Sequence, residues 1–544
     1  MNKVLGRLLK KRGIDEDFLN PKYEDLTAPE NLPDMEKAVE RVLRARDKKE
    51  KVLIYGDYDV DGVTATTIMV NTLEMVGITE VDTMLPDRFI DGYGMSQRLV
   101  DRVKKEQFPL VITVDCGSNN EEIIDQLNQL ETEVIVTDHH EILGNLPEAI
   151  AVVNPKRPDF RLEVKNNKKI AGLEDLSGAG VAFMLAKALT NRKAIPEGME
   201  KWLLDLATVG IICDAMNLTR DNRIICHYGF IVLGKTRRPG FQELLKVSDV
   251  RKLNSMAVGY QIGPRLNAAG RMETAEKALE LLTTKSRVKA AELADNLNGL
   301  NIGRRTQQQQ ALKEVEENGV GEEPVLVITG KWSEGIVGII AGKLMEKYKR
   351  PSFVLTEVDG DYKGSGRSFG DFNLALALDE CQDVIASGGG HAAACGVRLP
   401  KEMLDSFKQK INDYYRSLNL ENQKKYLDVQ ADLDIYELAD LDTELMEGLQ
   451  KMEPFGDGNQ EPVFCLKDMF VLSMTKMGSE QQHLSLIIRD DFGVTMRLVA
   501  FYADDEWMDI SPGTQLDVWV HLTENEWRDQ KTIEGRILKL GVVI

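Results

Sequence analysis

Short apolar runs alternate with longer amphipathic stretches through residues 51–153. The runs predict strands at 51–56, 80–84, 110–114, 133–137 and 150–153. The stretches between them predict helices, such as one from Gly62 to about Met75 and another over 119–130. Strands and helices that alternate at this spacing indicate βαβ units around a mostly parallel sheet.

The pattern changes further along the chain. Residues 178–191 and 199–213 predict two buried helices, and 285–317 is free of proline and rich in helix-forming residues. As one helix it would be about 48 Å long at 1.5 Å per residue, so we interpret it as a bridge between two lobes, with a solvated helical face as the alternative. A second α/β unit begins near 324. After about 424, short β-type segments predict a small barrel or sandwich: 462–474, 482–489, 494–502, 515–523 and 530–543.

Length and composition limit the number of domains, the cellular location and the binding partners that we expect. A chain of 544 residues is expected to form several domains. No apolar run approaches the ~20 residues that cross a bilayer, and the six scattered cysteines fit a reduced compartment, so we expect a cytoplasmic protein with no membrane contact. The net charge of −20 argues against polyanion binding by the whole surface, but a local basic cleft remains compatible with it.

Acidic and imidazole side chains follow several predicted strands and one helix. They are Asp57, Asp59 and Asp61, then Asp115, then Asp138, His139 and His140, and finally Asp214. Residues at the carboxyl ends of parallel strands meet at one edge of a sheet, where open α/β folds hold ligands. Hard oxygen ligands with an imidazole favour Mn²⁺ or Mg²⁺ over zinc, and Asp115 is the natural bridge between two ions.

Each of these residues has a structural alternative. An aspartate after a strand is commonly a helix N-cap, adjacent histidines are often structural, and Asp214 has Arg220 and Arg223 nearby as partners. Four such elements in order favour the metal site. The sequence has no Gly-x-Ser-x-Gly elbow and no Walker-type phosphate loop, which argues against a serine hydrolase and against ATP-driven work.

Phosphate-binding residues are predicted in the second α/β unit. Glycines at 388–390 allow backbone N–H groups to approach an anion, His391 adds a donor, and Arg367 can bind a phosphate through two nitrogens. An ordinary tight turn is the alternative for the glycines.

The motifs together are similar to those of the DHH phosphoesterase superfamily. The segments are Gly-Asp-Tyr-Asp-Val-Asp-Gly at 56–62, Val-Asp-Cys-Gly at 114–117 and Thr-Asp-His-His at 137–140, while the segment at 387–396 resembles the signature of the accompanying DHHA1 domain. Three further segments, 85–94, 263–272 and 453–464, resemble the RecJ family of single-strand-specific DNA exonucleases within this superfamily.

The resemblance implies an α/β fold with a DHH parallel-sheet domain and a DHHA1 α/β domain joined by a long helix, plus a C-terminal OB-like β-barrel. We expect residues 1–50 to be helical and to pack on the DHH domain. The remaining boundaries are 51–284 for DHH, 285–317 for the helix, 318–423 for DHHA1 and 424–544 for the nucleic-acid-binding barrel. Phe501, Tyr502, Trp519 and Trp527 are either base-stacking platforms or barrel core.

The resemblance implies a metal-dependent exonuclease that degrades single-stranded DNA from the 5′ end to mononucleotides in recombination and repair. The implied metal ligands are Asp57, Asp59, Asp61, Asp115, His139 and Asp214. Asp115, His139 and His140 are the implied catalytic residues, and Asp138 is expected to orient a histidine. The expected DNA and phosphate contacts are Arg88, Arg265, Arg271, Arg304, Ser365, Arg367, Gly389, Gly390 and His391.

A monomer bound to two Mn²⁺ or Mg²⁺ ions is expected, with a helicase and a single-strand-binding protein as further partners. Two alternatives remain open. One is a DHH phosphodiesterase for cyclic dinucleotides or short RNA, although such small substrates need neither the barrel nor the 263–272 segment. The other is a non-catalytic replication scaffold, against which the intact acidic cluster argues.

Overall fold

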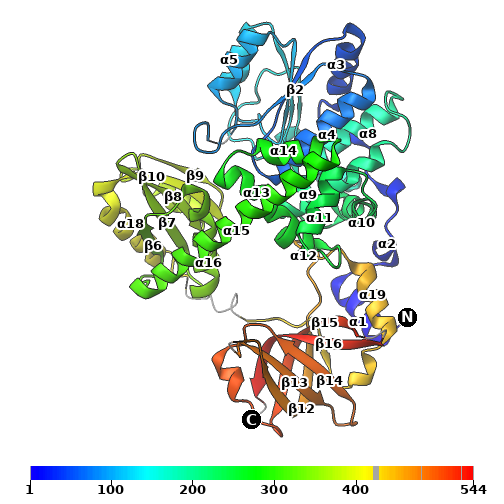
Figure 1. Ribbon diagram of the computed structural model, residues 1–544, viewed down its shortest axis with the longest axis vertical. Coiled ribbons are helices and arrows are strands. Elements are labelled where there is room, and N and C mark those ends of the chain that lie inside the picture. Colours follow the sequence, from blue (N-terminus) through cyan, green and yellow to red (C-terminus); the bar gives the residue numbers. More distant parts are fainter. Residues whose placement is uncertain (1, 93, 421–427, 480, 528–529, 543–544) are drawn as a thin grey trace. The chain divides into compact units, whose positions relative to one another are not determined.

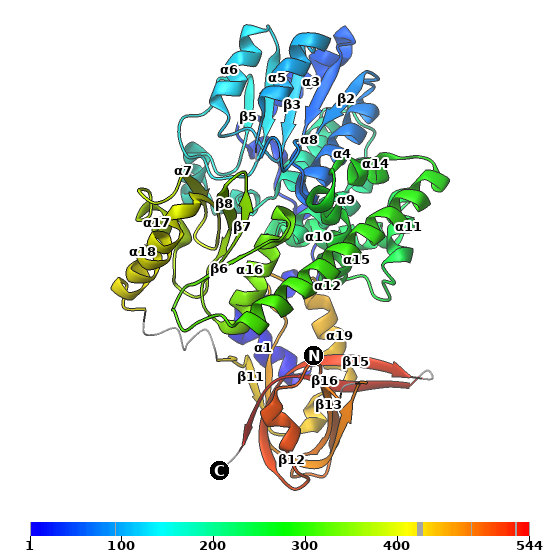
Figure 2. The same cartoon turned by 60° about the vertical axis from the view of Figure 1, so that its left-hand side comes forward.

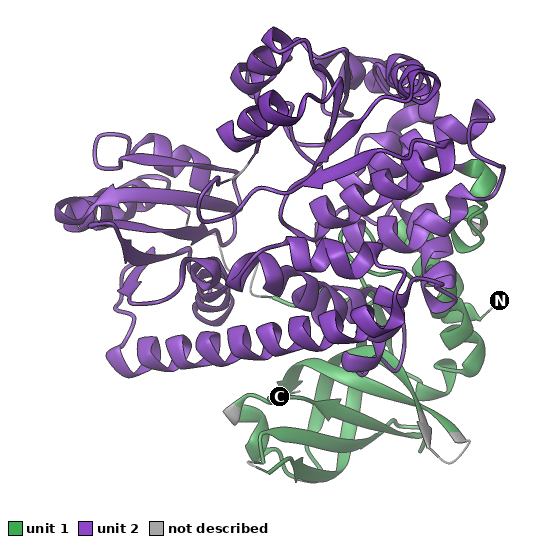
Figure 3. Cartoon of the chain, turned by 45° about the horizontal axis from the view of Figure 1, so that its top comes forward, with its two compact units in different colours: residues 1–25, 426–544 green, residues 26–425 purple. Residues whose placement is uncertain are grey.

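The computed structural model describes residues 2–92, 94–420, 428–479, 481–527 and 530–542. The chain forms two compact units (Figure 3). One is Leu26–Lys425, and the other joins Met1–Asp25 to Tyr426–Ile544. Among the described residues, no helix combines the length and the apolar character needed to cross a membrane.

A parallel sheet organises the first lobe of the larger unit (Figure 1). Its strands are β1 (Val52–Tyr55), β2 (Val81–Met84), β3 (Leu110–Val114), β4 (Glu133–Thr137) and β5 (Ala151–Val153), in the order β2-β1-β3-β4-β5. Every pair is parallel. The strands predicted from the apolar runs are therefore confirmed, and each ends within two residues of its predicted end.

Helices cover both faces of this sheet. Side chains from α5 (Gln97–Glu106) and α6 (Glu121–Gln129) pack on one face with Leu53 and Tyr55. On the other face lie α4 (Val60–Val76) and α8 (Gly178–Asn191) (Figure 2). Since both faces are covered, β1 and β3 are buried along their whole length, which explains their uninterrupted apolar sequence.

A helical layer follows the sheet along the chain. It contains α9 (Leu204–Cys213), α10 (Arg220–Gly234), α11 (Pro239–Val247), α13 (Gly263–Met272) and α14 (Glu276–Thr283). The long helix α15 (Arg287–Asn318) packs on α11, α13 and α14, whereas Ala311 and Val315 near its end lie in the core of the second lobe. The predicted bridging helix is thereby confirmed (Figure 3).

The second lobe has a mixed sheet in the order β6-β7-β8-β10-β9. The strands are β6 (Leu326–Gly330), β7 (Ser352–Val358), β8 (Asp361–Arg367), β9 (Ser387–Gly390) and β10 (Ala394–Pro400). Only β6 and β7 among these neighbours are parallel. Helix α16 (Glu334–Tyr348) and the end of α15 cover one face, while α17 (Leu374–Asp379) and α18 (Leu404–Ser417) cover the other.

The smaller unit is a β-barrel. Its strands are β12 (Phe464–Met477), β13 (His483–Arg489), β14 (Thr495–Ala500), β15 (Gln515–Trp527) and β16 (Gln530–Val542), and pairing of β12 with β15 closes it. A short strand, β11 (Leu433–Ile435), extends β12 in parallel. Helix α19 (Thr443–Met452) contributes Leu445 and Leu449 to the core. The predicted OB-like barrel is confirmed.

One expectation about the N-terminal segment is wrong. Residues 1–25 do not belong to the parallel-sheet domain, because α1 (Lys3–Arg12) buries Val4, Leu5, Leu8 and Leu9 in the core of the barrel unit. Only the later part of the predicted segment, with α3 (Met35–Lys48), packs against β5 and α8 of the first lobe. The apolar stripe of a short amphipathic helix predicts burial but does not identify the surface that buries it.

Candidate metal centre and phosphate pocket

The loop after β1 presents alternate aspartates to the carboxyl edge of the parallel sheet. Asp59 is the N-cap of α4 and accepts a 3.0 Å hydrogen bond from the N–H of Gly62. Asp61 lies in the first turn of α4 and is 1% exposed. Thus the N-cap alternative describes Asp59, but it leaves the second carboxylate oxygen of Asp59 and both neighbouring aspartates for other roles.

Asp61 is held by the N-terminus of α8. Its carboxylate accepts hydrogen bonds from the Ser177 hydroxyl at 2.9 Å, the Gly178 N–H at 2.6 Å and the Ala179 N–H at 3.1 Å. A Cβ on Gly210 of α9 would lie 2.4 Å from Oδ1 of Asp61, so only glycine fits there. The carboxylate is therefore fixed from two helices, at a helix end that favours negative charge.

Asp115 follows β3 in the left-handed backbone region, with φ of 61°. Its N–H donates to the carbonyl of Thr137 at the end of the neighbouring strand, at 2.9 Å. The side chain is 2% exposed. The turn thus directs Asp115 toward the edge where β4 ends.

The end of β4 supplies Asp138, His139 and His140, which have different surroundings. The Asp138 carboxylate accepts from the N–H groups of Ser118, His139 and His140 and from Nδ1 of His140 at 2.8 Å. These bonds engage both carboxylate oxygens of Asp138 and fix the ring of His140. Burial alone would raise the pKa of Asp138, but the bond from His140 and the nearby imidazoles lower it well below its usual range.

The ring of His139 points into the acidic cluster. Its Nε2 lies 3.0 Å from Oδ1 of Asp115, 3.5 Å from Oδ2 of Asp214 and 3.8 Å from Oδ2 of Asp61. Ligand atoms gather within 4.8 Å of one another in three overlapping groups: Asp115, His139 and His140; Asp61, His139 and Asp214; Asp57, Asp59 and Asp115. Asp115 and His139 each belong to two groups.

Burial and mutual repulsion raise the pKa of four carboxyls in the cluster. Burial is the larger cause and a neighbouring aspartate the next, giving about 8 for Asp57, about 6 for Asp61 and about 9 for Asp214, and a pKa well above the usual range for Asp115. Burial also lowers the pKa of His139 to about 3, so its contact with Asp115 is not an ion pair. The negative charge of such a cluster is poorly compensated unless a cation binds to it.

The residues fit a divalent cation. Within the described part of the cluster, three buried ligand atoms lack a hydrogen-bond partner: Oδ1 of Asp57, Oδ1 of Asp115 and Nε2 of His139. Buried polar atoms normally have a hydrogen-bond partner, so unpaired ligand atoms that converge are those that a bound cation would satisfy. Carboxylate oxygens with one imidazole suit Mn²⁺ or Mg²⁺.

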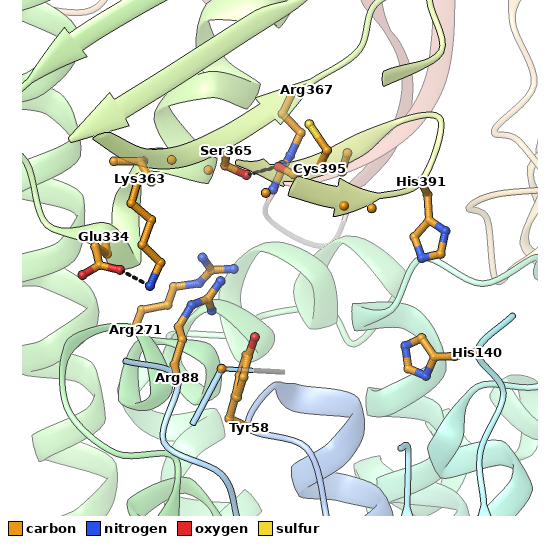
Figure 4. Close-up of a pocket in the computed structure, with 18 of the residues that line it drawn as sticks. Tyr58, Arg88, His140, Arg271, Glu334, Lys363, Ser365, Arg367, His391 and Cys395 are labelled. Carbon is orange, nitrogen blue, oxygen red and sulfur yellow. Dashed lines mark hydrogen bonds and ion pairs between the residues drawn. The ribbon is translucent and has the colours of Figure 1, made fainter. Parts of the chain in front are cut away.

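A pocket of about 650 Å³ lies between the two lobes of the larger unit, next to this cluster (Figure 4). His140 lines it from the first lobe and His391 from the second. The predicted phosphate-binding residues that also line it are Arg88, Arg271, Ser365, Arg367, Gly389 and Gly390. Although burial alone would lower the pKa of His140, its bond to Asp138 raises it to about 9, so a cationic ring faces the pocket.

Two arginines of the pocket are held in place by local bonds. Nη1 of Arg367 donates to the Ser365 hydroxyl at 2.9 Å and to the Gly366 carbonyl at 2.8 Å. Arg271 donates to the carbonyl of Gly335 at the start of α16, at 3.2 Å. Burial, and then the charges of Arg88 and other arginines nearby, lower the pKa of Arg271 to about 9. Several guanidinium groups that repel one another across a pocket favour an anion between them.

Other predicted residues lie outside this pocket. The guanidinium of Arg265 donates to Asn298 and to the carbonyls of Gln261 and Val247, and that of Arg304 donates to Asn301 and Gln308. In the barrel, Phe501 is 63% and Tyr502 79% exposed, so neither is core. Trp519 is half-buried, with Lys539 over its ring, and the side chain of Trp527 lies outside the described residues.

Sequence reasoning missed the groups that support the ligands. The Ser177 hydroxyl donates a hydrogen bond to Asp61. Asn154 donates to the Ser118 hydroxyl at 2.8 Å and to the His140 carbonyl at 3.0 Å. Ser-Gly-Ala-Gly at 177–180 carries a helix-start signal, yet nothing in the spacing indicates which carboxylate it meets. The close approach of Tyr58 and Arg88 was missed as well.

Comparison with known families gives three matches along the chain. The DHH family N-terminal domain matches residues 51–211, the DHHA1 domain 322–417 and the RecJ OB domain 432–539. The three matched regions follow one another in the order of the parallel-sheet lobe, the mixed-sheet lobe and the barrel.

Individual relatives agree with these matches. The single-stranded-DNA-specific exonuclease RecJ of Dickeya dadantii is 31% identical over 98% of this chain and 94% of its own length. The protein of the same name from Bacillus subtilis is 34% identical over 97% of this chain, which spans 66% of that relative. Crystal structures of RecJ from Thermus thermophilus with Mn²⁺ and with Mg²⁺ have TM-scores of 0.84 and 0.78, at 27% and 26% identity, and cover 99% of this chain and 76% and 74% of those chains.

Proposed function

Because the chain belongs to the RecJ family of DHH phosphoesterases, we propose that it is a metal-dependent exonuclease that hydrolyses single-stranded DNA from the 5′ end to 5′-mononucleotides. One observation carries the proposal. His140 belongs both to the acidic cluster, with Nδ1 4.0 Å from Oδ1 of Asp115, and to the wall of the arginine-lined pocket. A DNA strand with one phosphodiester at the cluster can therefore place its neighbouring phosphate among the arginines of the pocket.

The proposed metal ligands are Asp57, Asp59, Asp61, Asp115, His139 and Asp214. Two cations at this position would activate a water nucleophile and neutralise the leaving oxygen. The protein's own contribution is positional. Asp115 is shared by two ligand groups, which suits a bridging carboxylate, and Ser177 with the N-terminus of α8 fixes Asp61 before any cation binds.

The pocket accounts for the proposed polarity. Arg88, Ser365 and Arg367 would hold the terminal 5′-phosphate, while His140 would donate from Nε2 to a phosphoryl oxygen because Nδ1 is engaged by Asp138. A pocket that holds the strand's end allows cleavage only at a fixed distance from that end, and a distance of one nucleotide would release mononucleotides. The 5′ ends of a double helix are base-paired, so duplex DNA would have to be opened by a helicase before this enzyme could degrade it, with a single-strand-binding protein as a further proposed partner.

A time course on end-labelled oligonucleotides tests the proposal. Single-stranded and blunt duplex DNA, labelled at the 5′ or the 3′ end, would be incubated with Mn²⁺, Mg²⁺ or chelator. We expect early release of a labelled mononucleotide from 5′-labelled single strands, a ladder from 3′-labelled ones, and no reaction with chelator.

Degradation of blunt duplex at the single-strand rate would overturn the substrate assignment, and release first from the 3′ end would overturn the polarity. Short RNA and a cyclic dinucleotide belong in the same assay. Faster hydrolysis of either would favour the alternative phosphodiesterase activity. Absence of metal-dependent hydrolysis on every substrate would favour a scaffold.

A further inference from the structure

Tyr58 lies between two of the proposed metal ligands in sequence, yet its side chain serves the other site. Asp57 and Asp59 flank it, and both belong to the acidic cluster. The Tyr58 ring instead lines the pocket, where the guanidinium carbon of Arg88 lies 5.0 Å from the ring centroid (Figure 4). One short loop therefore contributes to the cation ligands and to the wall that faces the phosphate.

The Tyr58 ring is a close contact of the Arg88 guanidinium. Among the described residues, no ion pair or hydrogen bond joins Arg88 to a carboxylate, and Asp57 acts on it only through its charge, whereas Arg367 has hydrogen-bond partners on its own strand. The loop that carries Arg88 is fixed at its base, since Asp87 accepts from the N–H groups of Phe89 and Ile90 and Asp91 accepts from that of Asp87. The backbone of the loop is thus set, and the end of the long Arg88 side chain contacts the Tyr58 ring.

The backbone of Tyr58 also contacts the helix that carries Arg271. A Cβ on Gly270 would lie 2.9 Å from the carbonyl oxygen of Tyr58, so the absence of a side chain lets α13 approach this loop. Arg271 follows directly and also lines the pocket. Tyr58 is therefore in contact with two of the elements that bring guanidinium groups to the anion.

We propose that Tyr58 is a positioning residue that aims Arg88 at the terminal 5′-phosphate and so fixes the distance between that phosphate and the metal centre. The inference rests on the proposed function, because it assumes that the pocket holds the 5′ end. A guanidinium over an aromatic face is held by the ring quadrupole while its N–H groups stay free to bind oxygen. A carboxylate in the same place would bind those N–H groups and weaken the attraction for phosphate.

The test compares strands with a 5′-phosphate and a 5′-hydroxyl, using wild type, Tyr58→Phe, Tyr58→Leu, Arg88→Ala and the double variant. Tyr58→Leu removes the aromatic face, and we expect KM for the phosphorylated strand to rise about 5- to 30-fold with a smaller change in kcat and in the hydroxyl strand. Tyr58→Phe keeps the face and should retain the preference for phosphate. The double variant should lose no more preference than Arg88→Ala alone.

Tyr348→Leu is the matched control, because Tyr348 also lies near an arginine, Arg350 at 5.7 Å, but does not line the pocket. Calorimetry of Mn²⁺ binding shows whether the loop with Asp57 and Asp59 keeps its structure in Tyr58→Leu. Binding of thymidine 5′-monophosphate under the same conditions compares the phosphate affinity of the variants without turnover.

The outcomes distinguish failure of the proposed role of Tyr58 from failure of the proposed function. If Arg88→Ala loses the phosphate preference and Tyr58→Leu keeps it, the role of Tyr58 is overturned and the proposed function stands. If the wild type has no phosphate preference in turnover or in nucleotide binding, the assignment of the pocket fails and the role of Tyr58 fails with it. If Tyr58→Phe loses the preference as Tyr58→Leu does, the hydroxyl rather than the aromatic face is responsible, and placement of Arg88 by the ring is overturned.

Discussion

A Cβ atom on Gly178 would lie 2.4 Å from Cβ of Asp115, so these two positions share a space that admits one side chain. The contact joins the start of α8 to the turn after β3, and both sides of it are buried. Because Asp115 is shared by two of the three ligand groups, the position of Gly178 affects the geometry of both.

Gly178→Ala should therefore disable the centre. The added methyl group has to displace Asp115 or α8, and a misplacement of about 1 Å can lower the rate by about 100-fold. We expect a loss of that order in single-strand hydrolysis and weaker Mn²⁺ binding. Gly303→Ala on α15 is the control, since nothing lies within 4 Å of its Cβ position, and it should be as active as the wild type. Equal activity of the two variants would contradict the steric argument.

Asp115→Asn should reverse its effect on stability when metal is added. Burial first, and neighbouring aspartates next, raise the pKa of Asp115, which means that its charge is unfavourable in the metal-free fold. In chelator the variant should unfold at a higher temperature than the wild type, and in excess Mn²⁺ at a lower one. Activity should fall by at least about 100-fold, since even groups that only support a ligand contribute about 10- to 100-fold.

Thermal unfolding with and without Mn²⁺ measures this reversal. Asp295→Asn, on an exposed face of α15, is the matched control and should show no reversal. If Asp115→Asn were less stable than the wild type in both conditions, the carboxylate would be a structural group rather than a ligand.

Leu8→Ala should destabilise the barrel unit and leave the larger unit unaffected. Leu8 is fully buried in the core that α1 shares with α19 and the barrel strands. Truncation of such a side chain typically costs about 2–5 kcal/mol. Hydrogen exchange read by mass spectrometry should increase in β12 and β15 and stay unchanged in β1 and β3. Lys10→Ala, on the exposed face of the same helix, is the control. Faster exchange in β1 instead would restore the expectation that this segment packs on the first lobe.

The attachment of α1 should weaken at acidic pH. Asp432 accepts from Nε and Nη2 of Arg12, both at 2.7 Å; burial alone would raise the pKa of Asp432, but these bonds lower it. A lowered folded-state pKa contributes stability above the unfolded value of about 3.9, and the contribution is lost as pH falls through the folded value. Asp432→Asn should reduce protection of residues 3–12 at pH 7 by about 1–3 kcal/mol.

The difference between wild type and Asp432→Asn should then shrink below about pH 4. Hydrogen exchange at pH 7 and near pH 3, corrected for intrinsic rates, gives both values. A difference that stays constant across this range would mean that the carboxylate charge is not involved.

The local parts of the fold follow from the sequence. Apolar runs predict β1 to β5 almost to the residue, because strands buried on both faces tolerate little else. The carboxylates that end those strands meet because parallel strands share an edge, which is a property of topology rather than of any single residue. The convergence of Asp61, Asp115 and His139 was predictable for this reason.

Contacts between distant segments were not predictable in the same way. The arginines of 263–272 and α15 look equivalent as charges, but Arg271 lines the pocket whereas Arg265 is bound by the carbonyls of Gln261 and Val247. The partner of Ser177 and the core that receives α1 are set by packing across more than 100 residues. Neither of these two contacts produces a periodic pattern in the sequence.

The union of residues 1–25 with residues beyond 426 has a consequence for biosynthesis. At about 5–20 residues per second, a ribosome needs roughly 20–80 s to translate the intervening stretch. During that interval α1 has left the ribosome, but the barrel residues that bury its apolar stripe have not yet been made. A helix that is made long before its packing partner is thus among the last to reach its final position, and until then its apolar face is accessible to a nascent-chain chaperone.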